Sequence, residues 1–179
     1  MKRLSVFLVI ITTIITPAFT QELSPPNKPY TVLDPSPGYI TINELIAGSG
    51  LGDRSVPFSR SYFGFTTIHA YQINENFLIG GGTGFAVYNG GTLIPLFSDI
   101  RYSFLVKTWT PYLYGEAGLL LNTGEGIKLF LNPGAGIRYT VSNMLAVNFG
   151  TGIRMQQISH RNTFVSFRLG VTFKPRLKK

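Results

Sequence analysis

Apolar and polar side chains alternate almost without exception along residues 163–173. A β-strand points successive side chains to opposite faces of its sheet. The segment is therefore predicted to be a strand with one apolar and one polar face. The apolar face holds Val165, Phe167, Leu169, Val171 and Phe173, and the polar face holds Ser166, Arg168, Gly170 and Thr172.

Turn-rich stretches divide the chain from Tyr39 onward into eight extended segments, none with a sustained helical period. The alternation is clearest in the second half of the chain. In the segment 127–140, Phe130 is the one apolar residue on the polar face. An even number of antiparallel strands returns the chain to the side on which it began. The predicted strands are 39–51, 62–73, 77–88, 93–104, 111–121, 127–140, 145–157 and 163–173.

The side chains of the polar faces are small and few of them are charged. This indicates that the polar faces line the inside of a barrel. Charged residues make up 13% of the chain, against about 25% in typical soluble proteins. Strands of about 12 residues, tilted by roughly 40°, cover about 25–30 Å, the height of a lipid-facing band. The pattern predicts an all-β, eight-stranded, antiparallel, up-and-down transmembrane β-barrel. Glycines on the polar face are Gly48, Gly50, Gly134, Gly136, Gly150, Gly152 and Gly170.

A soluble periplasmic barrel of lipocalin type, holding an apolar ligand, is the alternative fold. It would turn the apolar faces inward and place the charges in water. Glycines on a solvated outer face would weaken the strands without filling any space, so the membrane barrel is favoured.

The first twenty residues have the layout of a signal peptide. A basic start, Lys2 and Arg3, precedes an apolar run from 4 to 15 that is too short to cross a bilayer as a helix. Small residues before Gln21 favour cleavage after Thr20. The predicted organisation is a signal peptide at 1–20, a Pro-rich, extended and poorly ordered lead-in at 21–38, the barrel at 39–173, and a solvated basic tail at 174–179.

Charge and cysteine content exclude several classes of function. The chain has no cysteine, which excludes disulfides, thiol chemistry and a lipoprotein anchor. The formal net charge of +8 falls to +6 without Lys2 and Arg3, and four of the remaining positive charges lie in the last six residues. No basic helix or zinc-finger spacing accompanies them, so no nucleic-acid partner is expected.

Eight charged residues are predicted to point into the lumen, and they are the candidate site. Burying them unpaired would be costly, so we expect a hydrogen-bonded ion network. Such a network can fill the lumen as a structural plug, or it can form the selectivity ring of a narrow conduit. The eight residues are Glu44, Asp99, Arg101, Glu116, Lys128, Arg138, Arg154 and Arg168.

Catalytic, cofactor and metal sites find little support in the sequence. A Ser/His/Asp set is conceivable if the predicted loop 158–162, with Ser159 and His160, meets Asp53 in the loop after the first strand. Residues 80–84 are Gly-rich but lack the lysine and the helix of a phosphate loop. No catalytic activity, cofactor or metal ion is therefore expected.

Aromatic residues concentrate near the predicted strand ends, where girdles at the membrane interfaces are the natural explanation. They are Tyr39, Tyr62, Phe63, Tyr88, Phe104, Trp109, Tyr112, Tyr139 and Phe173.

Between Tyr39 and Phe173 the chain resembles the small outer-membrane β-barrel proteins of Gram-negative bacteria, the OmpA/OmpX-like class. The resemblance is one of pattern and rests on residues 63–67, 80–84, 93–97, 99–102 and the final strand. It implies an outer-membrane location, both termini in the periplasm, contact with outer-membrane lipids, and a structural or interaction role without catalysis. A narrow channel or small-ligand carrier is the alternative role.

The resemblance also implies an assembly signal in the last strand, recognised by the barrel-assembly machinery. Arg168, Gly170 and Phe173 match its first three elements, whereas Pro175 stands where a second aromatic would fall.

Overall fold

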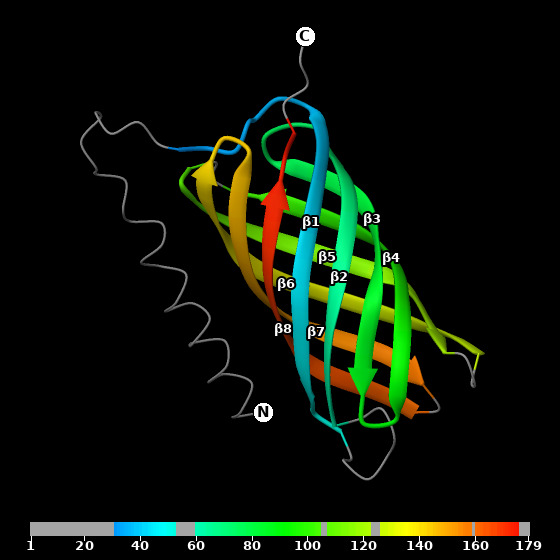
Figure 1. Ribbon diagram of the computed structural model, residues 1–179. Helices are drawn as coiled ribbons and strands as arrows, with labels where there is room; N and C mark the ends of the chain where they lie inside the picture. Colours follow the sequence, from blue (N-terminus) through cyan, green and yellow to red (C-terminus); the bar gives the residue numbers. More distant parts are fainter. Residues whose placement is uncertain (1–30, 53–59, 105–106, 123–125, 159, 176–179) are drawn as a thin grey trace.

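The computed structural model describes residues 31–52, 60–104, 107–122, 126–158 and 160–175, and the side chains of 158, 160 and 161 are excluded. Its strands form a closed antiparallel barrel in which each pairs with its neighbours in sequence (Figure 1). The predicted fold class is confirmed. The strands are β1 (Gly38–Gly50), β2 (Ser61–Gln72), β3 (Phe77–Tyr88), β4 (Gly91–Ser103), β5 (Trp109–Asn122), β6 (Gly126–Ser142), β7 (Leu145–Ile158) and β8 (His160–Phe173).

Strand β1 closes the barrel by pairing on both sides. Leu45 lies opposite Phe65 of β2 and opposite Leu169 of β8. A closed sheet has no edge, so every strand satisfies its backbone hydrogen bonds on both sides, as a lipid environment requires. Among the described residues, no helix is long and apolar enough to cross a membrane.

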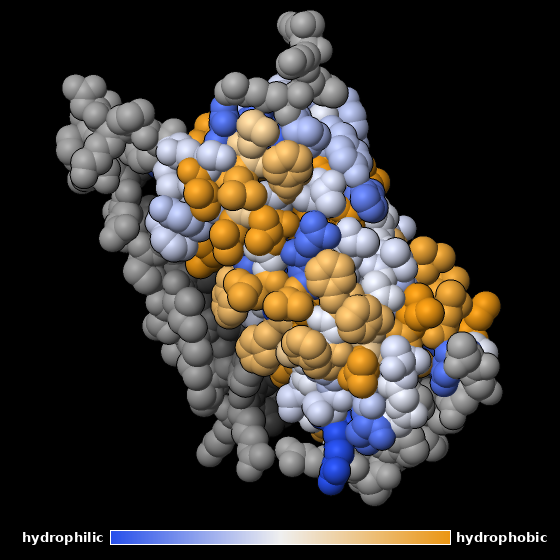
Figure 2. Space-filling model, in the orientation of Figure 1, coloured by the Kyte–Doolittle hydropathy of each residue, from blue (hydrophilic) through white to orange (hydrophobic). Residues whose placement is uncertain are grey.

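The apolar faces of the strands point outward. Leu169 is 53% exposed and Phe149 is 57% exposed, while their polar neighbours on the same strands are buried. Figure 2 shows apolar side chains spread over the wall of the barrel. This arrangement belongs to a barrel that meets lipid, and it is the reverse of a soluble barrel.

Inward-facing glycines leave room for inward-facing tyrosines. A Cβ atom at Gly134 would lie 2.3 Å from the Tyr114 hydroxyl oxygen, and one at Gly136 would lie 2.6 Å from that of Tyr112. Gly48 does the same for Tyr62, because its Cβ would lie 2.2 Å from the ring. Each of these glycines is paired with its tyrosine on the neighbouring strand. A narrow barrel can therefore hold these large rings only where the paired residue has no side chain.

Three of the residues predicted to lie in interfacial girdles are lumen residues instead. Tyr62, Tyr88 and Tyr112 are buried, because the register places them on the inward face. Phe130, the apolar residue on a polar face, also points inward and packs edge-on against Phe97 at 5.9 Å between ring centroids. Nearness to a strand end predicted these positions wrongly because it carries no information about the face.

The predicted loop 158–162 falls largely within strands. Strand β7 runs to Ile158 and β8 begins at His160, and the two residues are paired. The strands thus extend further than the alternation of apolar residues indicated.

Candidate functional site

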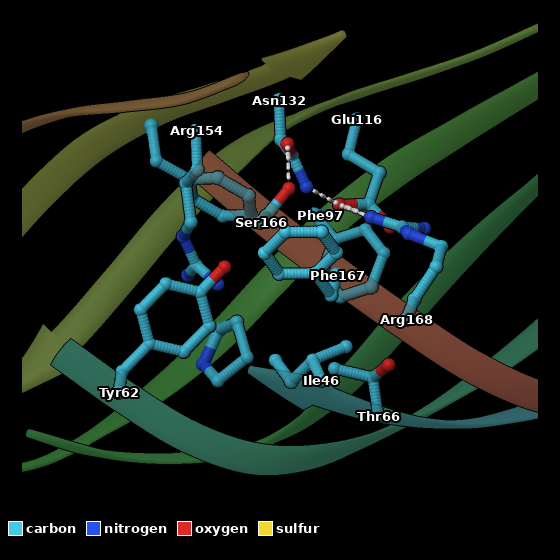
Figure 3. A pocket seen from close by; sticks show the side chains of 12 residues that line it. Ile46, Tyr62, Thr66, Phe97, Glu116, Asn132, Arg154, Ser166, Phe167 and Arg168 are labelled. Atoms are coloured by element: carbon cyan, nitrogen blue, oxygen red, sulfur yellow. Dashed lines mark hydrogen bonds and ion pairs between the residues drawn. The ribbon is translucent and has the colours of Figure 1, made fainter. Parts of the chain in front are cut away.

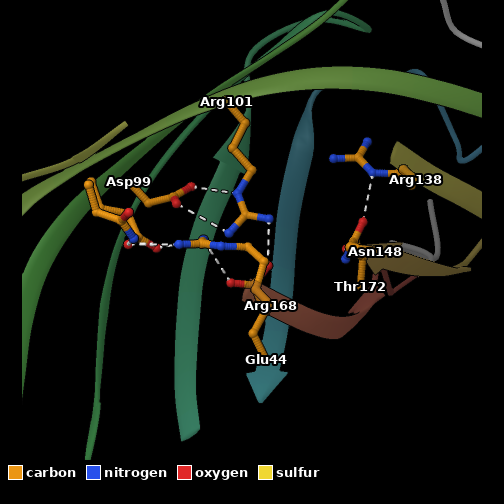
Figure 4. Close-up of polar contacts among 9 residues, drawn as sticks. Glu44, Asp99, Arg101, Arg138, Asn148, Arg168 and Thr172 are labelled. Carbon is orange, nitrogen blue, oxygen red and sulfur yellow. Dashed lines mark hydrogen bonds and ion pairs between the residues drawn. The ribbon is translucent and has the colours of Figure 1, made fainter. Parts of the chain in front are cut away.

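Five charged residues from four strands meet in the middle of the lumen (Figure 4). The Arg101 guanidinium donates from Nε to Asp99 Oδ1 at 2.9 Å and from Nη1 to Glu44 Oε1 at 2.8 Å. The Arg168 guanidinium donates from Nη1 to Glu44 Oε2 at 3.1 Å and to Glu116 Oε1 at 2.8 Å. Glu44 thus bridges the two arginines, and the group forms one continuous network, called the central network below.

The strand register explains why the central network needs two cations. Asp99 of β4 lies directly opposite Glu116 of β5, which would bring two like charges together. Arg101 and Arg168 each donate to one of these carboxylates and share Glu44. All five side chains are buried, so the paired charges offset a desolvation cost that neither partner could bear alone.

Neutral polar side chains extend the central network. Asn132 donates to Glu116 Oε2 at 2.8 Å, and the Ser166 hydroxyl donates to Asn132 Oδ1 at 3.1 Å (Figure 3). The ring of Tyr114 covers the Arg168 guanidinium at 3.7 Å. These three residues were not named from the sequence as site members. Asn132 and Ser166 do stand on the predicted polar faces, and that position is the signal that finds them.

Arg138 lies apart from the central network. Its Nε donates to Asn148 Oδ1 at 3.2 Å, and the Asn148 amide donates to the Thr172 hydroxyl at 2.6 Å (Figure 4). Among the described residues it forms no ion pair with a carboxylate. Its charge is instead met by an amide oxygen and by the face of the Tyr112 ring at 5.8 Å.

The last two predicted residues of the site also lie outside the central network. Arg154 is buried and stacks on two aromatic rings. Lys128 is half-buried near the start of β6. It lies on the inward face, two residues before Phe130. The structure thus brings together five of the eight predicted residues and places Lys128, Arg138 and Arg154 elsewhere in the barrel.

Residues 33–36, called the N-terminal strap below, cross the end of the barrel at which β1 begins and β8 ends. Leu33 is buried there, and the Asp34 amide donates to Asn143 O at 2.9 Å. Lys174 is 3% exposed and its Nζ donates to Asp34 O at 2.7 Å and to Ser36 O. The predictions of a poorly ordered lead-in and a solvated tail therefore fail for these residues.

Desolvation lowers the pKa of the Lys174 amine from its usual value, and the nearby Asp34 carboxylate opposes the shift. The amine donates mainly to backbone carbonyl oxygens.

Residues with catalytic or metal-binding potential are not assembled within the part of the chain that the structure describes. No group of three His, Cys, Asp or Glu side chains there could hold a metal ion. His69 points outward and its Nδ1 bonds the Tyr39 hydroxyl. Asp53 and Ser159, two members of the conceivable catalytic set, and the side chain of the third, His160, lie outside the described residues.

Among solved structures, Neisserial surface protein A (NspA) is similar over 78% of this chain and 99% of its own, with a TM-score of 0.56 and 16% sequence identity. The chain has the fold of a small outer-membrane β-barrel. The resemblance expected from the sequence is thus confirmed for the fold. An identity of 16% shows a shared fold and not a shared function. No family model matches the sequence, and no curated protein matches it.

Two further outer-membrane barrels are similar at lower TM-scores. The outer membrane enzyme PagL is 11% identical over 75% of this chain and 99% of its own, with a TM-score of 0.48. The N-terminal β-barrel domain of Pseudomonas aeruginosa OprF is 13% identical over 77% of this chain and 100% of its own, with a TM-score of 0.46.

Proposed function

We propose that this protein is an integral outer-membrane barrel with a structural or interaction role, whose lumen neither catalyses a reaction nor conducts ions. The observation that carries the proposal is the central network, which fills the middle of the lumen with paired, buried side chains. A conduit needs solvated groups along its path, whereas these carboxylates and guanidinium groups contact one another.

The proposal includes the route and orientation of the chain. Residues 1–20 act as a cleaved signal peptide, and both ends of the barrel chain face the periplasm. The short basic start and apolar run at residues 2–15 support the leader. The even strand number supports a common side for the start of β1 and the end of β8.

Two measurements test the membrane location and the closed lumen. In cell fractionation, the protein is expected in the outer-membrane fraction and to migrate differently on a gel when it is not boiled. In planar bilayers, the purified barrel is expected to show no stable unitary conductance. Large ion-selective steps would instead support the narrow channel, and release from membranes without detergent would overturn the location.

Strand β8 is proposed to be recognised by the barrel-assembly machinery through Arg168, Gly170 and Phe173. Phe173 suits this role because its side chain is exposed at the end of the strand. The variant Phe173→Ala should lower the heat-modifiable fraction in cells and leave refolding of the purified protein unchanged. An equal loss in both settings would assign Phe173 to stability instead.

A further inference from the structure

Arg154 of β7 is a buried cation without a counterion. Its side chain is 2% exposed, and among the described residues no carboxylate forms an ion pair with it. Its Cζ lies 4.5 Å from the Phe130 ring centroid and 4.9 Å from that of Tyr62. Contacts with ring faces stabilise the charge but accept no hydrogen bond at the edge of the guanidinium. Its Nε and Nη2 atoms accordingly have no partner.

A small cavity adjoins Arg154 (Figure 3). Its volume of about 10 Å³ leaves room for one small particle. Thr66, Arg154 and Arg168 line it, and each has a buried polar atom without a partner, namely Thr66 Oγ1, Arg154 Nε and Nη2, and Arg168 Nε. Four unsatisfied polar atoms thus belong to three residues around one cavity.

The unsatisfied guanidinium atoms are donors, whereas the Glu116 and Asn132 acceptors on the same wall are already used. The Glu116 oxygens accept from Arg168 and Asn132, and Asn132 Oδ1 accepts from Ser166. The guanidinium nitrogens can only donate, and the Thr66 hydroxyl can donate as well. An occupant of this cavity must therefore accept several hydrogen bonds at once.

Charge distinguishes an anion from a water molecule as that occupant. Among the described residues, the lumen buries four guanidinium groups, of Arg101, Arg138, Arg154 and Arg168, but three carboxylates, of Glu44, Asp99 and Glu116. A water molecule would satisfy N–H groups and leave the excess positive charge uncompensated in a medium of low dielectric constant. A monovalent anion satisfies both requirements.

We propose that the cavity beside Arg154 binds one small monovalent inorganic anion of the size of chloride or bromide. Arg154 supplies the charge and two donors, and Thr66 and Arg168 supply the others. Aromatic side chains lie between this site and the nearer end of the barrel, since Phe164 is paired with Arg154 and packs against Tyr62 at 5.4 Å. The bound anion is therefore enclosed, and it offsets the excess of the four buried guanidinium groups over the three buried carboxylates.

Bromide scatters X-rays anomalously and provides a direct test on the unaltered protein. Crystals of the refolded full chain grown in sodium bromide should show an anomalous peak within hydrogen-bonding distance of the Arg154 guanidinium. Crystals in which the cavity holds only an oxygen-sized peak without anomalous signal would overturn the proposal.

A solution measurement tests the same site without a lattice. The urea midpoint of unfolding should rise with bromide concentration and saturate, when sodium gluconate keeps the ionic strength constant. The variant Arg154→Gln should abolish this dependence. Arg60→Gln removes the same charge from an exposed position outside the strands, so it should retain the dependence. Equal midpoints of the wild-type protein in bromide and gluconate, or an unchanged bromide response in Arg154→Gln, would overturn the proposal.

Discussion

Single residues in the central network have effects that their pairwise contacts understate. Glu44 accepts from two arginines that also hold Asp99 and Glu116 in place. Removing its charge leaves two buried guanidinium groups facing a neutral amide. Glu44→Gln is expected to lower the free energy of unfolding by about 3–5 kcal/mol, as breaking a buried ion pair does. Urea titration of the barrel refolded in phospholipid vesicles measures this change.

The matched control for Glu44 is Glu75→Gln, because Glu75 is an exposed carboxylate outside the strands. Its free energy of unfolding should stay within about 0.5 kcal/mol of the wild-type value. Equal losses in the two variants would mean that net charge, and not the central network, governs the stability.

Glycine positions permit a second comparison at the scale of the residue. A Cβ at Gly134 would lie 2.4 Å from the backbone oxygen of Thr151 and 2.3 Å from the Tyr114 hydroxyl oxygen. A backbone atom and a buried ring cannot move away without cost. Gly134→Ala is expected to cost about 1–3 kcal/mol, the usual penalty of overpacking. At Gly115 no atom lies within 4 Å of the added Cβ, and Gly115→Ala should be neutral or slightly stabilising. The urea midpoint of unfolding should therefore fall in Gly134→Ala and not in Gly115→Ala. Equal midpoints in the two variants would contradict the packing argument.

At the scale of the element, the alternation predicted which face of β4–β8 turns inward. Lipid outside the barrel selects apolar side chains, whereas the lumen selects polar or small ones. The first three strands alternate less cleanly, and the inward faces of β1 and β2 mix Glu44 and Thr66 with Ile40, Ile42 and Ile68. The partners of each charge could not be predicted either. They depend on register between strands far apart in sequence, as for Arg168 and Glu44, which are 124 residues apart.

The N-terminal strap is a separate element whose docking depends on Lys174. The amine holds the carbonyl oxygens of Asp34 and Ser36 over the end of the barrel. Lys174→Met keeps the length of the side chain and removes these bonds. Amide exchange of Asp34, whose N–H is bonded to Asn143 O, should then become faster. Amides in the middle of β5 serve as the control and should not change, and an unchanged Asp34 rate would contradict the anchoring role of Lys174.

At the scale of the whole molecule, the lumen is closed three times along its length. Tyr62, Tyr88 and Phe164 pack together at one end, with ring centroids 5.1–5.9 Å apart. The central network fills the middle, and the N-terminal strap covers the other end. Closures in series differ from a single gate, because removing one of them leaves no continuous path for ions.

Phe164→Ala tests this closure in series. Loss of a fully buried phenylalanine is expected to destabilise the barrel by about 3–5 kcal/mol and to open a cavity at one end. The middle of the lumen stays filled, so the folded variant should still show no stable conductance in planar bilayers. Gel mobility without boiling verifies that the protein added to the bilayer is folded. Steady unitary currents through Phe164→Ala, absent from the wild-type protein, would show that the aromatic cluster is the sole gate and that the central network does not close the lumen.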